Sequence, residues 1–243
     1  MASSKKAAIQ INNVHLSIDE KQILKGISGV FYEGEITTMV GPSGAGKSTL
    51  LKLCNGLLSP SLGEIYIQDE LITSYNPINL RRLVGIALQS SPMISGTVLH
   101  NLSLPMKLQG KKLAEKNAIE LLEDVGMEAG FLHTNIKDLS GGQRQKVSIA
   151  RTLVNQPQIL LLDEITSALD RISQKEIEEL IIKINKKYGT TIVWITHNLE
   201  QALDVGNYSW VMMEGVVVEM GKSNLLHSSE NERVQCFVKG EFV

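Results

Sequence analysis

The chain has 243 residues, of which 43% are hydrophobic and 21% charged, enough apolar material for a globular domain with a sizeable core. Its net charge of −2 argues against a nucleic-acid-binding protein, which usually carries a basic excess or a basic stripe. The N-terminus lacks the apolar segment of a secretion signal, and no run approaches the ~18 to 20 apolar residues of a membrane-spanning helix. We therefore expect a cytoplasmic protein that reaches any membrane through a partner.

Alternating apolar residues near the N-terminus predict β-structure. We expect strands over residues 7–18 and 23–32, joined by a polar turn at 19–21. Residues 36–40 form a continuous apolar run, which predicts a buried strand. A helix should follow after a short loop, because leucines recur at the spacing of one helical face: Leu50, Leu51, Leu53 and Leu57.

The loop between that strand and that helix has the P-loop spacing G-x-x-x-x-G-K-S. Its glycines let backbone N–H groups approach a polyphosphate, and the following helix directs its positive end at the same phosphates. Lys47 would contact the β- and γ-phosphates, and Ser48 would place its hydroxyl on Mg²⁺. A glycine-rich turn without a ligand is the alternative, which the order of strand, loop and helix makes improbable. The predicted nucleotide-binding residues are Gly41, Pro42, Ser43, Gly44, Ala45, Gly46, Lys47, Ser48 and Thr49.

After Gln89 the chain changes character. Residues 90–156 show helical periodicity without strand patterns, and Pro105 should end or bend the first of these helices. We interpret residues 90–156 as a helical subdomain inserted into an α/β core, which comprises residues 1–89 and 157–243. Within the insertion a helix is expected at 140–154. Outside the insertion the expected strands are 64–68, 84–88, 159–162, 190–196, 208–213 and 216–220, and helices are expected at 79–83, 173–187 and, weakly, in the tail.

The two cysteines, Cys54 and Cys236, lie far apart in the sequence. Their spacing suggests neither a disulfide framework nor a metal site. We expect both to be small buried groups in a reducing compartment.

A second phosphate-shaped sequence precedes the helix predicted at 140–154. Ser140 is a plausible N-cap, Gly141 and Gly142 expose backbone N–H groups, and Gln143 follows them. This sequence lies too far along the chain to belong to the P-loop. Taken alone, an ordinary capped helix after a glycine turn explains it about as well.

An acidic pair, Asp163 and Glu164, directly follows the apolar run 159–162. An Asp at the end of a central strand is placed to hold the P-loop metal, directly or through water. The adjacent Glu could activate the attacking water as a general base. A solvated acidic pair at a strand end is the common alternative, and it is less attractive in a P-loop protein.

Together these motifs strongly resemble the ATP-binding-cassette (ABC) ATPases, over about residues 9–221. Any one motif is weak evidence, whereas six motifs in the family's order leave little room for chance. They are the Walker A loop (41–49), the Q-loop glutamine Gln89, the ABC signature (139–143), the Walker B strand (159–163) with the catalytic glutamate Glu164, the D-loop (167–170) and the switch histidine His197.

The resemblance implies an α/β fold class: a P-loop NTPase fold with an ABC-type antiparallel β subdomain and an inserted α-helical subdomain, all within one ABC ATPase domain of residues 1–243. It implies ATP and Mg²⁺ as cofactors, with Ser48, Gln89 and Asp163 at the metal. Glu164, His197, Lys47 and Gln89 are the expected catalytic groups.

The resemblance also implies a homodimer when ATP is bound. Two ABC subunits pair head to tail, so each ATP lies between one Walker A loop and the partner's signature. Ser140, Gly141, Gly142, Gln143 and Asp170 would then act on the nucleotide of the partner subunit.

One position departs from the family pattern. ABC ATPases usually carry an aromatic residue near the end of the first strand, where it stacks on adenine. The aligned position is about Ile18, with His15 nearby, and no Tyr or Phe occurs between Ile9 and Val30. We therefore expect weak selectivity for the base.

We interpret the chain as the ATP-hydrolysing subunit of an ABC transporter, bound to the inner face of the cell membrane through an integral membrane subunit. We expect neither direct membrane insertion nor a nucleic-acid partner. One alternative is a soluble ABC-type ATPase that acts on nucleic acid or ribosomes, although such proteins typically carry two cassettes or long coiled-coil insertions. Another is a P-loop phosphotransferase, which would need an acceptor substrate.

Two residues resemble a smaller group within the family. Ile165 stands where proline is usual, and Trp194 lies in the strand before the switch histidine. These features resemble stand-alone ATPases linked to iron or metal homeostasis in bacteria and to aluminium tolerance in plants. Export related to metal homeostasis is therefore one expectation, with phosphate or amino-acid import as alternatives.

The resemblance further implies a groove between the α/β core and the helical subdomain, in which a short helix of the membrane subunit docks. We expect residues 90–102 to line this groove. Within them, residues 91–95 carry apolar side chains without the periodicity of a buried element, so Met93 and Ile94 should be partly exposed. The alternative is a connecting loop whose Met93 and Ile94 fold back on the subdomain.

Overall fold

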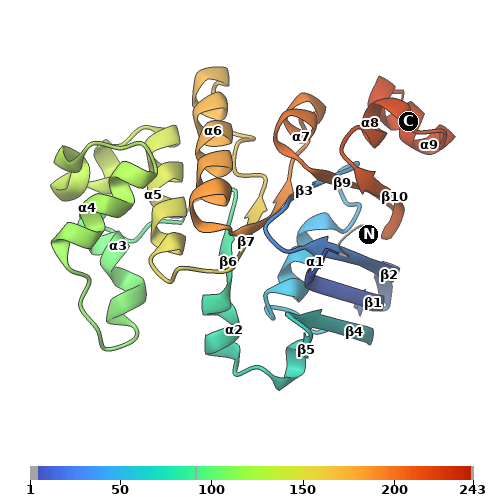
Figure 1. Ribbon diagram of the computed structural model, residues 1–243, viewed down its shortest axis with the longest axis horizontal. Coiled ribbons are helices and arrows are strands. Elements are labelled where there is room, and N and C mark those ends of the chain that lie inside the picture. The colour runs from blue at the N-terminus through green and yellow to red at the C-terminus, as the bar shows by residue number, and fades with distance from the viewer. Residues whose placement is uncertain (1–4, 91, 242–243) are drawn as a thin grey trace.

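The computed structural model describes residues 5–90 and 92–241, which form two β-sheets with helices around them (Figure 1). The strands are β1 (Ala7–Ile18), β2 (Lys21–Tyr32), β3 (Ile36–Val40), β4 (Leu62–Ile67), β5 (Glu70–Leu71), β6 (Val84–Ala87), β7 (Ile159–Asp163), β8 (Thr191–Ile195), β9 (Tyr208–Met213) and β10 (Val216–Lys222). The helices are α1 (Lys47–Cys54), α2 (Pro77–Leu83), α3 (Val98–Lys107), α4 (Glu115–Asp124), α5 (Gly141–Leu153), α6 (Arg171–Tyr188), α7 (Leu199–Val205), α8 (Leu225–Ser228) and α9 (Glu232–Lys239), with 3₁₀ turns at Ile72–Ser74, Ala129–His133 and Ile136–Asp138.

The two sheets differ in strand direction. The smaller sheet is antiparallel, in the order β2-β1-β4-β5. The larger sheet has the order β10-β9-β3-β8-β7-β6, in which the strands from β9 to β6 run parallel and β10 returns antiparallel to β9. The carboxyl ends of β3, β8, β7 and β6 therefore meet at one edge of the larger sheet, where α/β proteins bind ligands.

Three apolar clusters hold the layers together. The first lies between the two sheets, where α1 is inserted and the rings of Phe31 and Trp210 stack with centroids 4.3 Å apart. The second joins the other face of the larger sheet to α3, α4, α5 and α6, and contains Trp194. The third packs α7, α8 and α9 on β9 and β3. The larger sheet is covered on both faces, so its parallel strands are largely apolar, and the polar residues Thr37, Thr38 and Ser209 are themselves buried.

Between β6 and β7 the described chain is helical, as residues 90–156 led us to expect. The helices α3, α4 and α5 stand at one side of the sheet, coloured green to yellow in Figure 1, and an isolated bridge joins Thr97 to Asn135. Pro105 lies inside α3, which continues for two residues to Lys107. Within the described ranges, every helix is too short or too polar to cross a bilayer.

Most predicted elements lie within one or two residues of the observed ones. The structure differs from the predictions in the helix α7, which was not predicted, and in Cys236, which was expected to be buried. We did not predict α7, a helix of seven residues whose start is capped when the Asn198 side chain accepts from the Gln201 N–H.

The two cysteines differ in burial. Cys54 is wholly buried, and burial raises its pKa to about 12. Cys236, by contrast, is half-buried, because it lies on the surface helix α9, of which Val234 is the buried residue.

Candidate functional site

The P-loop connects β3 to α1 and passes very close to neighbouring strands. Gly41 has φ +144°, and a Cβ there would lie 1.9 Å from the carbonyl oxygen of Met212. Gly46, the N-cap of α1, has φ +95°, and a Cβ there would lie 2.7 Å from the side chain of Leu24. Both positions therefore require glycine. No side chain caps α1, so its first N–H groups are available to phosphate oxygens.

Lys47 places a positive charge inside this loop. Its ammonium donates to the carbonyl oxygens of Gly41 at 2.8 Å and Pro42 at 2.9 Å. An ammonium has three N–H donors, so a third remains for a phosphate. Burial lowers the pKa of Lys47, and the nearby carboxylates of Glu164 and Asp163 oppose that effect.

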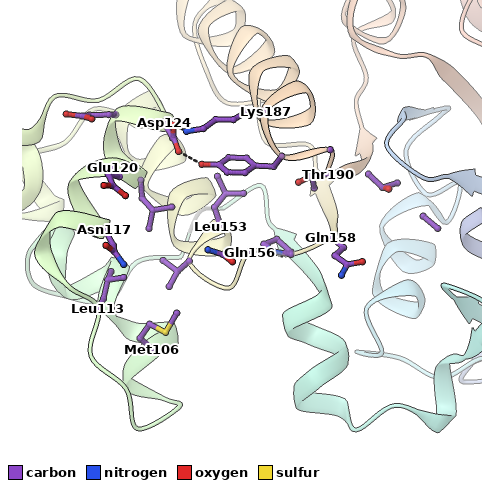
Figure 2. A pocket seen from close by; sticks show the side chains of 18 of the residues that line it. Met106, Leu113, Asn117, Glu120, Asp124, Leu153, Gln156, Gln158, Lys187 and Thr190 are labelled. Carbon is purple, nitrogen blue, oxygen red and sulfur yellow. Dashed lines mark hydrogen bonds and ion pairs between the residues drawn. The ribbon is translucent and has the colours of Figure 1, made fainter.

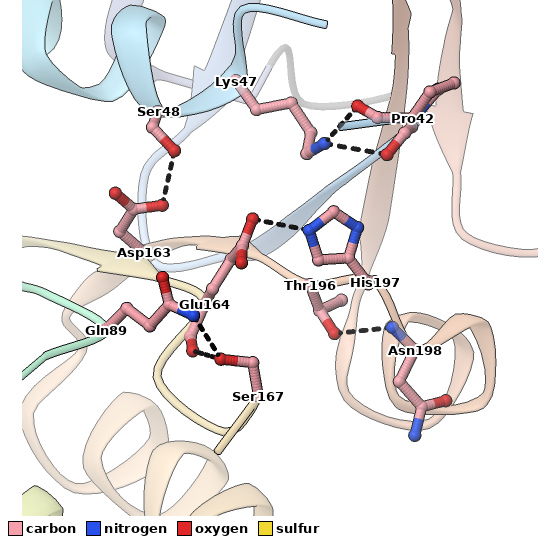
Figure 3. A network of polar contacts seen from close by, with 11 residues as sticks. Pro42, Lys47, Ser48, Gln89, Asp163, Glu164, Ser167, Thr196, His197 and Asn198 are labelled. Carbon is pink, nitrogen blue, oxygen red and sulfur yellow. Dashed lines mark hydrogen bonds and ion pairs between the residues drawn. The ribbon is translucent and has the colours of Figure 1, made fainter. Parts of the chain in front are cut away.

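Ser48 and Asp163 meet where α1 faces the end of β7. The Ser48 hydroxyl donates to Oδ1 of Asp163 at 2.7 Å. Burial raises the pKa of Asp163 above its ordinary value, more than the Ser48 hydrogen bond lowers it, and the Glu164 charge adds to the rise. Figure 3 shows this pair beside Gln89 and Glu164.

The oxygen atoms of this pair fit a magnesium ion. Mg²⁺ in nucleotide sites is usually held by one or two carboxylates together with substrate phosphates. Ser48 and Asp163 supply a hydroxyl and a carboxylate at one point, and the Gln89 amide lies beside them in Figure 3. No group of three or more His, Cys, Asp or Glu side chains that could hold a metal occurs in the described part of the chain. A magnesium ion would therefore be held in part by the nucleotide.

Glu164 is held in an unusual backbone conformation. Its φ of +50° lies in the left-handed region, which is costly for a residue other than glycine. Its N–H donates to the carbonyl oxygen of Ile195 at 3.1 Å, and one carboxylate oxygen accepts from Nε2 of His197 at 2.6 Å. The side chain is thus aimed away from Asp163 and toward His197, which extends from the end of β8 (Figure 3).

Gln89 joins the same network through a residue to which the sequence analysis gave no role. Its side-chain amide donates to Oγ of Ser167 at 2.9 Å, and the Ser167 hydroxyl donates to the Glu164 carbonyl oxygen at 2.9 Å. The structure thus gathers Lys47, Ser48, Gln89, Asp163, Glu164 and His197 at one sheet edge. The sequence offers no signal for the Gln89–Ser167 contact, since both residues lie in loops and are 78 positions apart.

The signature residues lie outside this network. Ser140 caps α5 in a capping box, in which its Oγ accepts from the Gln143 N–H and the Gln143 side chain accepts from the Ser140 N–H. Among the described residues, none accepts from the N–H groups of Gly141 and Gly142, and no hydrogen bond or ion pair joins 140–143 to the P-loop. Asp170 caps α6 and accepts from Ser173.

Ile18, at the predicted adenine position, ends β1 and is 45% exposed. His15 lies on the same strand and is bonded to the side chains of Asn13 and Gln22. Neither residue supplies an aromatic ring free to stack at the strand end.

A cavity of about 810 Å³ lies away from this network, between the helical subdomain and the core (Figure 2). Its described lining contains none of the predicted site residues. On one wall Asp124, the last residue of α4, accepts from Lys187 and from the Tyr188 hydroxyl, while Lys183 donates to the Asp124 carbonyl oxygen at 3.0 Å. We call these four residues the Asp124 anchor.

A groove of about 540 Å³ opens between α2, the end of β6, α3 and α5. Pro92 is the one lining residue from the segment 90–102 that we expected to form the groove, and Ser91 lies outside the described residues. Ile94 is exposed as expected, whereas Met93 is half-buried, packs against the second apolar cluster and receives a contact from Arg151. Most of the wall instead comes from residues outside 90–102, which we did not expect in the groove: Ile78, Arg81, Arg82, Gly85, Ile86, Leu88, Leu104, Pro105, Leu108, Gln109, Ser148, Arg151, Thr152 and Asn155.

Comparison with known proteins agrees with this geometry. A family model described as "ABC transporter" matches residues 24–167. The "Putative ABC transporter ATP-binding protein YjkB" of Bacillus subtilis is 41% identical over 219 residues, covering 90% of this chain and 87% of that protein. "ABC transporter I family member 17" of Arabidopsis thaliana is 35% identical, with coverage of 98% and 91%. The "Glycine betaine transport ATP-binding protein OpuAA" of Bacillus subtilis is 38% identical, covering 86% of this chain and 51% of that protein.

Solved structures give the same result. The cbiO1 protein of Clostridium perfringens, described as part of the ABC transporter complex cbiONQ, superimposes with a TM-score of 0.83 at 28% identity, covering 96% of this chain and 95% of that one. The ATP-binding cassette MJ0796, in a dimeric post-hydrolysis state bound to ADP and Pi, superimposes with a TM-score of 0.77 at 32% identity, covering 88% and 98%. The chain therefore belongs to the ABC transporter family, as an ATP-binding subunit with the fold of an ABC ATPase cassette.

Proposed function

We propose that this chain hydrolyses ATP to ADP and phosphate at the network of Figure 3, and that hydrolysis drives transport by a separate membrane subunit. The observation that carries the proposal is the 2.6 Å hydrogen bond between His197 and Glu164, beside the 2.7 Å pair of Ser48 and Asp163. These contacts place the proposed base Glu164, the His197 that orients it, and the metal-binding oxygens of Ser48 and Asp163 together beside the P-loop.

In this mechanism Glu164 acts on the attacking water. The water oxygen forms a bond to the γ-phosphorus while the bond to the ADP oxygen breaks, and the water proton passes to the Glu164 carboxylate. His197 holds the carboxylate at the angle this transfer needs. Lys47 and the N–H groups of α1 bind the phosphates. When bound, Mg²⁺ neutralises charge on the β- and γ-phosphate oxygens, and Ser48, Asp163 and Gln89 would hold it.

The test is Glu164→Gln, which keeps size and hydrogen bonding but removes the base. We expect nucleotide binding to remain and phosphate release to fall roughly 10²-fold or more, the scale of general-base loss. Phosphate release is measured without any acceptor, so turnover by the wild type also excludes a phosphotransferase. Near-normal turnover by the variant would contradict the role of Glu164.

We further propose that two subunits enclose two ATP molecules. The geometry of α5 supports this, because the N–H groups of Gly141 and Gly142 lie at the positive end of a helix outside the subunit's own P-loop network. Ser140, Gln143 and Asp170 then act in the partner's site. The dimeric cassettes among the structural relatives support the same arrangement. A Glu164→Gln protein should therefore form an ATP-dependent dimer in size-exclusion chromatography.

For the transported substrate we propose export related to metal homeostasis, on the family pattern of Ile165 and Trp194. Both side chains are buried, so they mark relatedness and do not contact a transported ion. The membrane subunit sets the substrate, and the cassette is expected at the inner face of the membrane through that subunit. ATP turnover of the reconstituted complex tests the proposal: stimulation by transition-metal ions supports it, and stimulation by phosphate, amino acids or glycine betaine instead would replace it.

A further inference from the structure

Ser167 connects two groups of the proposed ATPase site. Its hydroxyl accepts from the Gln89 amide and donates to the Glu164 carbonyl oxygen, with both distances 2.9 Å (Figure 3). A hydroxyl can accept one hydrogen bond and donate another at the same time. Ser167 thus joins the segment that follows β6 to the backbone of the proposed base.

The Glu164 backbone needs such a contact, because its left-handed conformation is held by hydrogen bonds on both sides. On one side its N–H donates to Ile195 at 3.1 Å. On the other its carbonyl oxygen accepts twice from Ser167, from the N–H at 3.1 Å and from Oγ at 2.9 Å. With the N–H held at Ile195 and the carbonyl oxygen held at Ser167, the peptide groups on both sides of Glu164 are fixed, and with them the direction of its Cα–Cβ bond toward His197. Loss of the Ser167 bonds would release the carbonyl side of this residue.

The rest of the loop between Glu164 and α6 is fixed to other elements. Gln174 donates its side-chain amide to the carbonyl oxygens of Thr166 at 3.2 Å and Leu169 at 2.9 Å. The buried Thr166 donates to Gln201 of α7 at 3.1 Å. Among the described residues of the loop between Glu164 and α6, Ser167 is the one whose side chain is hydrogen-bonded to the segment that follows β6, through Gln89. A shift of Gln89 can act on this loop through Ser167.

We propose that Ser167 is a positioning residue that transmits the position of Gln89 to the carboxylate of Glu164 within one subunit. The inference rests on the proposed ATPase function. Gln89 follows β6, and Leu88 and Pro92 on either side of it line the groove between core and helical subdomain. A segment that enters the groove and moves Gln89 would thereby align or misalign the base, without touching the nucleotide.

The first experiment compares Ser167→Ala with Ser167→Thr. Ser167 is exposed, so the added methyl group of threonine has room. Loss of the hydroxyl removes both the bond from Gln89 and the bond to the Glu164 carbonyl oxygen. It should lower kcat about three- to tenfold, the scale of a lost hydrogen bond, and leave the KM for ATP unchanged. Threonine should restore kcat. The matched control is Ser228→Ala, since the Ser228 hydroxyl also donates to a nearby backbone carbonyl oxygen, that of Asn224, but lies outside the site.

The second experiment is a double-mutant cycle with Gln89→Ala. If Ser167 acts through Gln89, Ser167→Ala should lower kcat less than about twofold once Gln89 is already alanine, because coupled residues are not additive. An undiminished three- to tenfold loss in that background would overturn the inference, and so would a wild-type kcat for Ser167→Ala alone. Either result leaves the proposed function standing if Glu164→Gln abolishes hydrolysis. A wild type without any ATP turnover would overturn both.

Discussion

Ile18 lies where we expect the nucleotide base to bind. It ends β1 with a largely exposed aliphatic side chain, and the carbonyl of Ile23 and the side chain of Leu24 in the adjoining strand lie against Gly46 of the P-loop. A branched aliphatic group offers neither a ring for stacking nor a donor or acceptor for the edge of the base. Stacking of a base on an aromatic ring is worth ~1 to 3 kcal/mol. Binding should therefore depend chiefly on the triphosphate and Mg²⁺.

We predict that ATP and GTP compete on similar terms for the wild-type protein, and that Ile18→Tyr tightens ATP binding by about 5- to 100-fold, the equivalent of one stacked ring. Competition against a fluorescent nucleotide measures both. Leu62→Tyr, which places a tyrosine at another exposed position of the same sheet, is the control. A strong preference of the wild type for ATP would show that another residue reads the base.

Single residues also show what the sequence could predict. Ser48 and Asp163 were both expected at the metal, and Glu164 and His197 were both expected at the reacting phosphate, because of the motifs that resemble the ABC family. The roles of these residues remain predictions. Ser167 was quoted within a motif but given no role, because its partner Gln89 is set by how two loops fold. The positive φ of Glu164 could not be predicted either, because no glycine marks that position in the sequence.

Among the helices, the extent of α6 was predicted to within two residues at each end. The side-chain contacts at its C-terminal end were not predicted. Its apolar face, with Ile177 and Ile181, packs in the second cluster as its periodicity indicates. The Asp124 anchor lies at the C-terminal end of α6, on its polar face. The hydrophobic periodicity predicts that this face is exposed to solvent but does not predict which residues it contacts. Burial tends to raise the pKa of Asp124, but the hydrogen bonds from Lys187 and Tyr188 outweigh it, so the pKa lies below its ordinary value. The anchor therefore holds α4 to α6 most strongly at pH values above the ordinary pKa of an aspartate, where Asp124 is ionised.

We predict that Asp124→Asn lowers the free energy of unfolding at pH 7 by about 0.2 to 1 kcal/mol, as for other exposed ion pairs. A lowered folded-state pKa adds stability above the unfolded pKa of about 4, which is lost as the pH falls through the folded value. The difference between variant and wild type should thus shrink near pH 3.5. Urea unfolding at both pH values measures it, with Glu120→Gln, from the exposed Lys116–Glu120 pair, as control. An equal loss at both pH values would contradict the assignment.

At the scale of the whole molecule, the groove between α2, α3 and α5 is the described surface that we propose for a membrane partner. Leu108, 78% exposed, and Ile78 offer apolar contact, and the charged lining residues are all arginines: Arg81, Arg82 and Arg151. We propose that it receives a segment of the membrane subunit with an apolar face and carboxylate side chains, since only such a segment balances this charge. The sequence predicted such a groove with residues 90–102 in its lining, and Pro92 is the described residue of that segment that lines this one. The place where the membrane subunit docks stays a prediction.

We predict that Leu108→Glu prevents co-purification with the membrane subunit from detergent and leaves nucleotide binding unchanged. Leu108→Lys should be milder, because a cation does not repel carboxylates. Leu62→Glu, an equally drastic change at an exposed leucine outside the groove, should have no effect. Full recovery of the partner with Leu108→Glu would place the docking surface elsewhere.

The order of the larger sheet has a consequence for how the protein is made. The strand β8 lies between β3 and β7, although it is synthesised about 150 residues after β3. Until Thr191–Ile195 has left the ribosome, β3 and the pair β6–β7 have no shared neighbour, and the backbone edges of β3 and β7 that pair with β8 lack their hydrogen-bond partners. Folding of the core must therefore wait for the last third of the chain, and a nascent chain stalled before residue 190 would be a substrate for chaperones rather than a partly working ATPase.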